Sequence, residues 1–83
     1  RFLKTQISLG VSPAAVYDQL DVQKPRLRDV IIRILTAKTV SEMDGPEDRE
    51  FIKDEIKLEL SNLLPLTQGE VLIQVYFTEF IIQ

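Results

Sequence analysis

Hydrophobic and polar residues alternate in the first segment of the chain. Over residues 2–11 the apolar or β-branched positions are Leu3, Thr5, Ile7, Leu9 and Val11, with polar residues or glycine between them. A period of two predicts a strand with one buried and one solvated face. Ser12 and Pro13 then suit the N-cap and first position of a short helix. We expect Pro25 to break or kink that helix and to keep Lys24 out of helical geometry.

The spacing of apolar residues then becomes helical over two longer segments. Residues 25–38 place one arc on a helix, with Ile32 beside it: Leu27, Val30, Ile31, Ile34 and Leu35. Residues 39–46 read as a loop that ends in a turn-forming Asp-Gly-Pro sequence. Residues 47–64 give a third helix with the arc Ile52, Ile56, Leu60 and Leu63. Residues 65–69 end it.

The last segment, residues 71–82, is rich in β-branched and aromatic residues and predicts a long strand. Its apolar parity changes near Thr78. Before that point the large residues are Val71, Ile73, Val75 and Phe77, and after it they are Phe80 and Ile82. A β-bulge near Thr78 and Glu79 would direct all six to the core. The alternative is a strand buried on both faces.

These elements predict a single α/β (α+β) domain over residues 1–83, in the order β-α-α-α-β. An amphipathic helix must bury its apolar arc, so we expect two layers with the helices on one face of a small antiparallel sheet. The chain does not begin with Met and reads as a fragment of a longer protein. A core this small leaves a role for a partner chain.

Composition excludes most enzyme classes. Cys and His are both absent, which removes thiol nucleophiles, zinc–thiolate sites and imidazole acid–base chemistry. The densest acid cluster, Asp44, Glu47 and Asp48, lacks the spacing of a calcium loop and suits the start of a helix. We therefore expect no catalytic residues, no metal and no cofactor. The net charge of −3 disfavours nucleic acid. Tyr76, Phe77 and Phe80 read as core rather than as a base-stacking platform.

Charges are segregated along the chain. Residues 24–38 hold five basic residues and one acid, a local net of +4, and residues 42–59 hold eight acids and three basic residues, a net of −5. One interpretation is two solvated helix faces that form ion pairs within the molecule. The other is a molecule with a positive and a negative side, suited to head-to-tail association that closes into a ring.

The third helix also carries a second apolar stripe. Phe51 and Leu58 are seven residues apart, so they share a face turned away from the main arc. Either another segment of the same domain covers this pair or another protein does. The hypothesis for a protein interface therefore comprises Arg26, Arg28, Arg33, Glu47, Asp48, Glu50, Phe51 and Leu58.

Two blocks of the sequence resemble a known family. Residues 25–32, PRLRDVII, followed by Lys38 and Thr39, are similar to the C-terminal domain of FliL, the flagellar basal body-associated protein. The ending VYFTEFIIQ, residues 75–83, resembles the same domain. The resemblance covers nearly the whole chain.

This resemblance implies a single-pass inner-membrane protein whose C-terminal domain faces the periplasm, with a fold like that of stomatin and prohibitin (SPFH) domains. It implies a non-enzymatic scaffold that forms ring-like homo-oligomers around the flagellar stator, the MotA–MotB unit, and stabilises it. Two rival functions are a periplasmic peptide- or ligand-binding module that adds a strand to an open sheet edge, and an enzyme using carboxylates alone.

Overall fold

The computed structural model describes residues 2–12, 14–63 and 72–83. The elements follow one another in the predicted order: β1 (Leu3–Ser12), α1 (Ala14–Val22), α2 (Lys24–Thr36), a 3₁₀ turn η1 (Val40–Glu42), α3 (Pro46–Leu63) and β2 (Leu72–Ile82). The fold is thus mixed α/β. Pro13 and residues 64–71, which include the expected loop 65–69 and Val71, lie outside the described residues.

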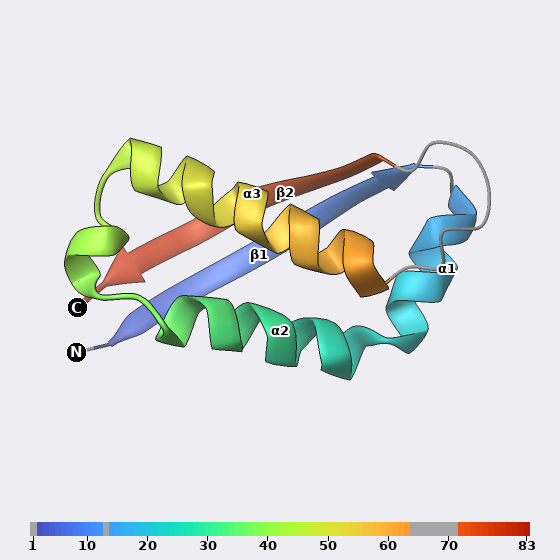
Figure 1. Cartoon of the computed structure of the whole chain (residues 1–83), viewed down its shortest axis with the longest axis horizontal. Helices are drawn as coiled ribbons and strands as arrows, with labels where there is room; N and C mark the ends of the chain where they lie inside the picture. Colours follow the sequence, from blue (N-terminus) through green and yellow to red (C-terminus); the bar gives the residue numbers. More distant parts are fainter. Residues whose placement is uncertain (1, 13, 64–71) are drawn as a thin grey trace.

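The two strands lie side by side and antiparallel, as predicted (Figure 1). Phe2 and Gln83 exchange backbone hydrogen bonds of 2.8 and 2.7 Å, so the ladder begins at the two ends of the chain. From there it extends to the pair formed by Ser12 and Leu72. The predicted alternation of β1 is confirmed, because its odd positions are half-buried and most of its even positions are exposed.

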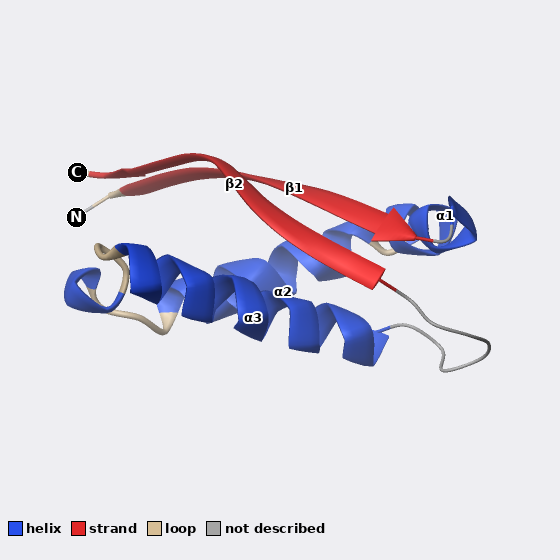
Figure 2. Cartoon of the chain, turned by 90° about the horizontal axis from the view of Figure 1, so that it is seen from above, coloured by secondary structure: helices blue, strands red, loops and turns tan. Residues whose placement is uncertain are grey.

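The helices occupy one face of this sheet. α2 and α3 run antiparallel to each other beneath the strands, and α1 lies at the end of the sheet where β1 stops (Figures 1 and 2). The predicted two-layer arrangement is therefore confirmed. The body measures 40 × 23 × 20 Å.

A β-bulge interrupts the ladder at Thr78. Gln6 pairs with Glu79 and Ile7 pairs with Phe77, so Thr78 has no opposite residue. Two threonine hydroxyl groups form hydrogen bonds across the bulge. Thr78 Oγ1 donates to the backbone carbonyl of Gln6 at 3.3 Å, and Thr5 Oγ1 donates to the backbone carbonyl of Glu79 at 2.8 Å. The predicted bulge is confirmed, and it returns Phe80 and Ile82 to the core-facing side of β2.

The break between α1 and α2 falls one residue earlier than the sequence predicts. Lys24 is the first residue of α2, and the expectation that it lies outside the helix is wrong. Gln23 breaks the helix instead, with φ −101° and ψ 15°. Its carbonyl accepts from the Leu27 N–H at 3.0 Å, so it serves as the N-cap backbone. Pro25 then lies in the first turn, where its missing N–H costs no helical hydrogen bond.

The core lies between the helix layer and the inner face of the sheet. Ile52, Ile56 and Leu60 of α3 are fully buried, and α2 contributes Leu27, Ile34 and Leu35, so both predicted arcs are confirmed. Ile32 stays outside the arc, as expected, and is exposed. Val16 and Leu20 of α1 and Ile73 and Val75 of β2 complete the buried set with Met43.

Truncation of a buried arc residue should destabilise so small a core. We expect Ile34→Ala to lower the free energy of unfolding by about 2–5 kcal/mol, because it removes buried methyl groups and leaves a cavity. Urea unfolding followed by circular dichroism measures this change. Ile32→Ala is the matched control on the exposed side of α2 and should change stability by about 1 kcal/mol or less. Equal effects of the two substitutions would contradict the packing described.

The bulge allows a second test. Insertion of one alanine between Thr78 and Glu79 turns Phe80 and Ile82 to the outer face, because a slip of one residue inverts every later side chain. Loss of these two contacts should cost about 3 kcal/mol or more. Thr78→Ala keeps the extra residue and should cost much less. Thermal melts that coincide for the insertion and the substitution would show that the bulge does not set the register.

Candidate functional site

The acidic start of α3 forms one end of the helix layer. Asp48 accepts a hydrogen bond from the Gly45 N–H at 3.1 Å, so this carboxylate caps the helix. Glu50 pairs with Lys53 at 3.3 Å. A shallow hollow of about 330 Å³ is lined by Glu47, Glu50, Phe51 and Asp54. Its floor is an exposed aromatic ring and its rim is acidic.

The acid cluster near residue 44 shows no sign of a cation site. Asp48 is engaged with the Gly45 backbone, and no group of three potential metal ligands occurs among residues 2–12, 14–63 and 72–83. The interpretation of Asp44, Glu47 and Asp48 as helix-start charges fits these contacts better.

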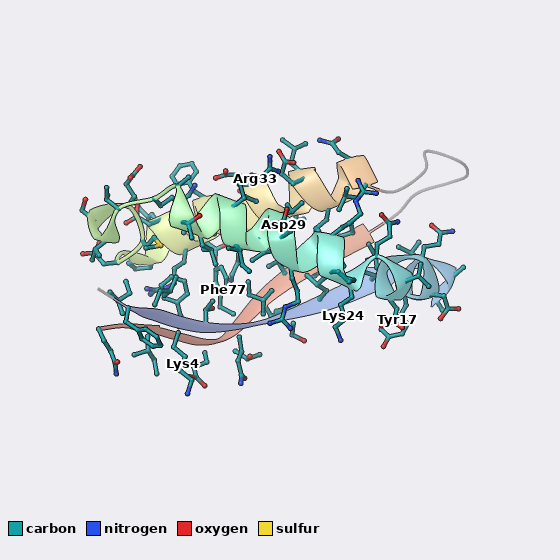
Figure 3. The ribbon with its side chains drawn as sticks, turned by 90° about the horizontal axis from the view of Figure 1, so that it is seen from below. Lys4, Tyr17, Lys24, Asp29, Arg33 and Phe77 are labelled. Carbon is teal, nitrogen blue, oxygen red and sulfur yellow. The ribbon has the colours of Figure 1, made fainter. Side chains whose placement is uncertain are left out.

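The structure divides the three predicted arginines of α2 between two faces. Arg26 and Arg33 line a hollow between α2 and α3, and Arg33 pairs with Glu59 of α3 at 3.4 Å. Arg28 lies on the opposite side of α2, where it lines a second hollow with Lys24 beside β1. Figure 3 shows this division, with Arg33 on the side of α3 and Lys24 nearer β1. The predicted basic flank is thus two separate surfaces.

Ion pairs within the molecule join the last turn of α2 and the residues just after it to the C-terminal half of α3. Lys38 pairs with Glu55 at 2.8 Å and Arg33 with Glu59 at 3.4 Å, so part of the charge segregation is resolved internally. The basic start of α2 and the acidic start of α3 do not meet. Because the helices are antiparallel, these starts lie at opposite ends of the layer (Figure 1).

The second apolar stripe of α3 is exposed. Phe51 and Leu58 are 72% and 64% exposed, so the alternative that another segment of the domain covers them is wrong for residues 2–12, 14–63 and 72–83. An exposed phenylalanine next to acids is typical of a contact surface. The remaining predicted option is a partner protein.

The aromatic residues of β2 pack as core, as predicted, with one exception. The rings of Phe77 and Phe80 meet edge to face with their centroids 5.1 Å apart. Arg49 of α3 lies over the Phe80 ring at 5.7 Å, and Lys53 lies over the Phe77 ring at 5.8 Å. Tyr76 instead lies on the outer face of the sheet and is exposed.

Sequence reasoning allowed for an open sheet edge but did not identify β1 as the strand that borders a groove. Two hollows border this strand on the side of α2 and α1, with volumes of about 590 and 250 Å³. The signal was available, since a pattern with only two strands leaves each strand one unpaired edge. The position of the edge beside basic residues depends on how the helices dock.

The family model of the flagellar basal body-associated protein FliL matches residues 1–83. A flagellar protein FliL from Aquifex aeolicus (strain VF5) is 37% identical over 82 residues, covering 99% of this chain and 49% of the relative. The chain belongs to the FliL family. The resemblance drawn from residues 25–32, Lys38 and Thr39, and residues 75–83 is therefore confirmed.

The similarity to the curated FliL protein covers only part of that protein. The chain spans about half of the curated FliL protein that it matches. In the portion that the structure describes, every helix is too short or too polar to cross a membrane.

The 3₁₀ turn η1, which precedes the acidic start of α3, contains a carboxylate with a shifted pKa, that of Glu42. The Thr39 N–H and hydroxyl both donate to Glu42 Oε1 at 2.9 Å, completing a capping box around η1. The backbone hydrogen bond from Thr39, then its hydroxyl, and then the charge of Lys38 lower the pKa of Glu42 below its ordinary value of 4.5. The folded state thus prefers the ionised carboxylate.

This preference predicts a pH-dependent contribution to stability. A lowered folded-state pKa stabilises the fold above the unfolded-state value of 4.5, and the contribution is lost as the pH falls through the folded-state value. Glu42→Gln should therefore be less stable than the natural chain at about pH 7, and the difference should be smaller at about pH 3. Urea unfolding at both pH values measures the difference, with Asp54→Asn as a surface control. A difference that stays constant with pH would contradict the assignment.

Proposed function

We propose that this chain is the periplasmic domain of a non-enzymatic scaffold that associates head to tail around the flagellar stator and stabilises it. A membrane segment outside the chain would hold it at the inner membrane. The MotA–MotB unit is the proposed stator partner, as the family resemblance implies. Family membership supports the flagellar location, and the surface of the helix layer supports the mode of association.

The observation that carries the proposal is the placement of unlike surfaces at opposite ends of one layer. The start of α3 presents Glu47, Glu50 and the exposed ring of Phe51. The start of α2 presents Arg26, whose guanidinium contacts only the nearby Gln23 side chain among the described residues, at 3.3 Å. A molecule whose two ends complement each other binds its copies heterologously, and a suitable rotation closes such contacts into a ring.

Within the proposed interface, apolar and charged residues act differently. Phe51 and Leu58 supply burial of aromatic and aliphatic surface, which carries most of the energy of protein interfaces. Glu47, Asp48 and Glu50 on one copy, and Arg26 and Arg33 on the next, steer the encounter and set the register. Arg28 belongs to the β1 side of α2 and is left outside the interface in this arrangement.

Strand addition remains the second candidate function. The open edge of β1, bordered by two hollows, is the observation in its favour. It is compatible with the scaffold, because Phe51 does not line either hollow.

Self-association is tested by disulfide cross-linking in cells. Because residues 1–83 contain no cysteine, paired substitutions report contacts cleanly. In the membrane-anchored protein, Asp29→Cys and Asp54→Cys together should give a ladder of cross-linked multimers, since a heterologous interface joins unlike surfaces. Each single substitution is the control and should give no ladder. Dimers alone from the double variant would indicate an isologous contact and contradict the proposal.

The same assay ranks the contacts. Phe51→Ala should reduce the ladder and swimming speed under viscous load more than Arg26→Glu does, and only the charge effect should fade as salt rises. Val22→Ala, at an exposed position of α1, is the matched control. Combining Arg26→Glu with Glu47→Arg should partly restore cross-linking. A double variant as defective as the worse single one would show that these ends do not meet.

A further inference from the structure

The free edge of β1 has a defined set of main-chain groups. Phe2 exchanges both of its hydrogen bonds with Gln83, and the Gln6 carbonyl accepts from Thr78 on β2. In an antiparallel ladder the backbone groups of successive residues point to opposite sides. Even-numbered residues of β1 therefore face β2, and Thr5, Ile7 and Leu9 direct their N–H and C=O groups to the other side. No hydrogen bond recorded among the described residues joins these groups to α1 or α2.

A groove runs along this edge. Its larger part, about 590 Å³, lies between β1 and α2, and its smaller part, about 250 Å³, continues between β1 and α1. We call the two parts together the β1-edge groove. Its principal lining residues beside the strand are Tyr17, Lys24, Leu27, Arg28, Ile31 and Ile32. In Figure 3, α2 and β1 flank this side of the molecule, with Lys24 and Tyr17 at its margin.

The lining combines apolar surface with positive charge. Ile32 and Tyr17 are 54% and 60% exposed, so the groove offers apolar side chains that the domain does not bury. Lys24 and Arg28 form no ion pair with another described residue. An occupant that carries carboxylates as well as apolar side chains complements both features.

A second copy of the chain fits this groove poorly. The described residues of its two strands include one acid, Glu79, which pairs with Lys4 at 3.3 Å. The exposed acids around Phe51 lie on a helix, which cannot complete a strand ladder. The described strands and helices of a second copy therefore do not supply the complementary extended segment.

We propose that the β1-edge groove binds an extended acidic segment of a partner protein, which adds to β1 as a third strand. Main-chain hydrogen bonds to Thr5, Ile7 and Leu9 hold the segment, its apolar side chains contact Ile31 and Ile32, and its carboxylates pair with Lys24 and Arg28. Strand addition of this kind draws its affinity from the ladder and its selectivity from the adjacent side chains. The site is separate from the proposed contact between copies.

A synthetic peptide tests the proposal directly. The probe is a nonapeptide, Val-Val-Glu-Glu-Val-Val-Glu-Glu-Val, in which both faces of the extended chain carry apolar and acidic groups. Titration into the chain, followed by amide hydrogen exchange, should slow exchange at Thr5, Ile7 and Leu9 and leave the amides already paired with β2 unchanged. N-methylation of every peptide nitrogen should abolish binding, because no peptide N–H can then donate to the ladder.

Substitutions locate the binding surface. Lys24→Glu with Arg28→Glu should weaken binding at least about tenfold, as should Ile32→Glu, because each places negative charge in the groove. Lys57→Glu on α3 is the matched control and should leave the affinity unchanged. A peptide with lysine in place of glutamate should bind at least about tenfold more weakly than the probe.

Several results would overturn the proposal: absence of binding up to about 1 mM peptide, binding without protection of the three edge amides, or an equal loss in the control variant. Protection that rises with the concentration of the chain alone would assign the edge to a second copy and also overturn it. Use of Phe51→Ala as the host separates the two hypotheses, since that variant should bind the peptide normally whether or not the chain self-associates.

Discussion

The pairing of β1 with β2 is the constraint on which the other features depend. It joins the two ends of the chain through Phe2 and Gln83 and places every helix in the connection between the strands. Because α2 and α3 must bury their apolar arcs, they cover one face of this ribbon, and the other face stays solvated. Two strands alone cannot satisfy their outer edges. The surface proposed for contacts between copies and the groove beside β1 both follow from this arrangement.

Features governed by local periodicity were predictable from the sequence. The arcs of α2 and α3 and the alternation of β1 follow from spacings of 3.6 and two residues, which depend on backbone geometry and not on distant contacts. The bulge was predictable for the same reason. A shift of parity at Thr78 indicates either a bulge or a strand buried on both faces. Burial of Phe80 and Ile82 on the same face as Phe77 requires the bulge.

Features that depend on how the helices and strands pack against one another were harder to predict from the sequence. The rule for residues before proline pointed to Lys24, but the helix accommodates Pro25 in its first turn and Gln23 takes the break. The sequence grouped Arg26, Arg28 and Arg33 by proximity, whereas a rotation of 100° per residue distributes them over two faces with different neighbours. The exposure of Phe51 could not be decided from periodicity, because it depends on whether a tertiary neighbour exists.

The adjacency of Phe2 and Gln83 also determines how the domain would respond to force. A load applied between these residues acts across the ladder and not along it, so the paired hydrogen bonds would open one after another from that end. Opening in this manner requires far less force than sliding two strands past each other, where many bonds must break together. The strands would first separate along the four residue pairs from Leu3–Ile82 to Gln6–Glu79, where the bulge and its two threonine hydroxyl bonds interrupt the regular ladder. The domain should therefore unfold at a lower force when it is pulled by Phe2 and Gln83 than when it is pulled through its helices.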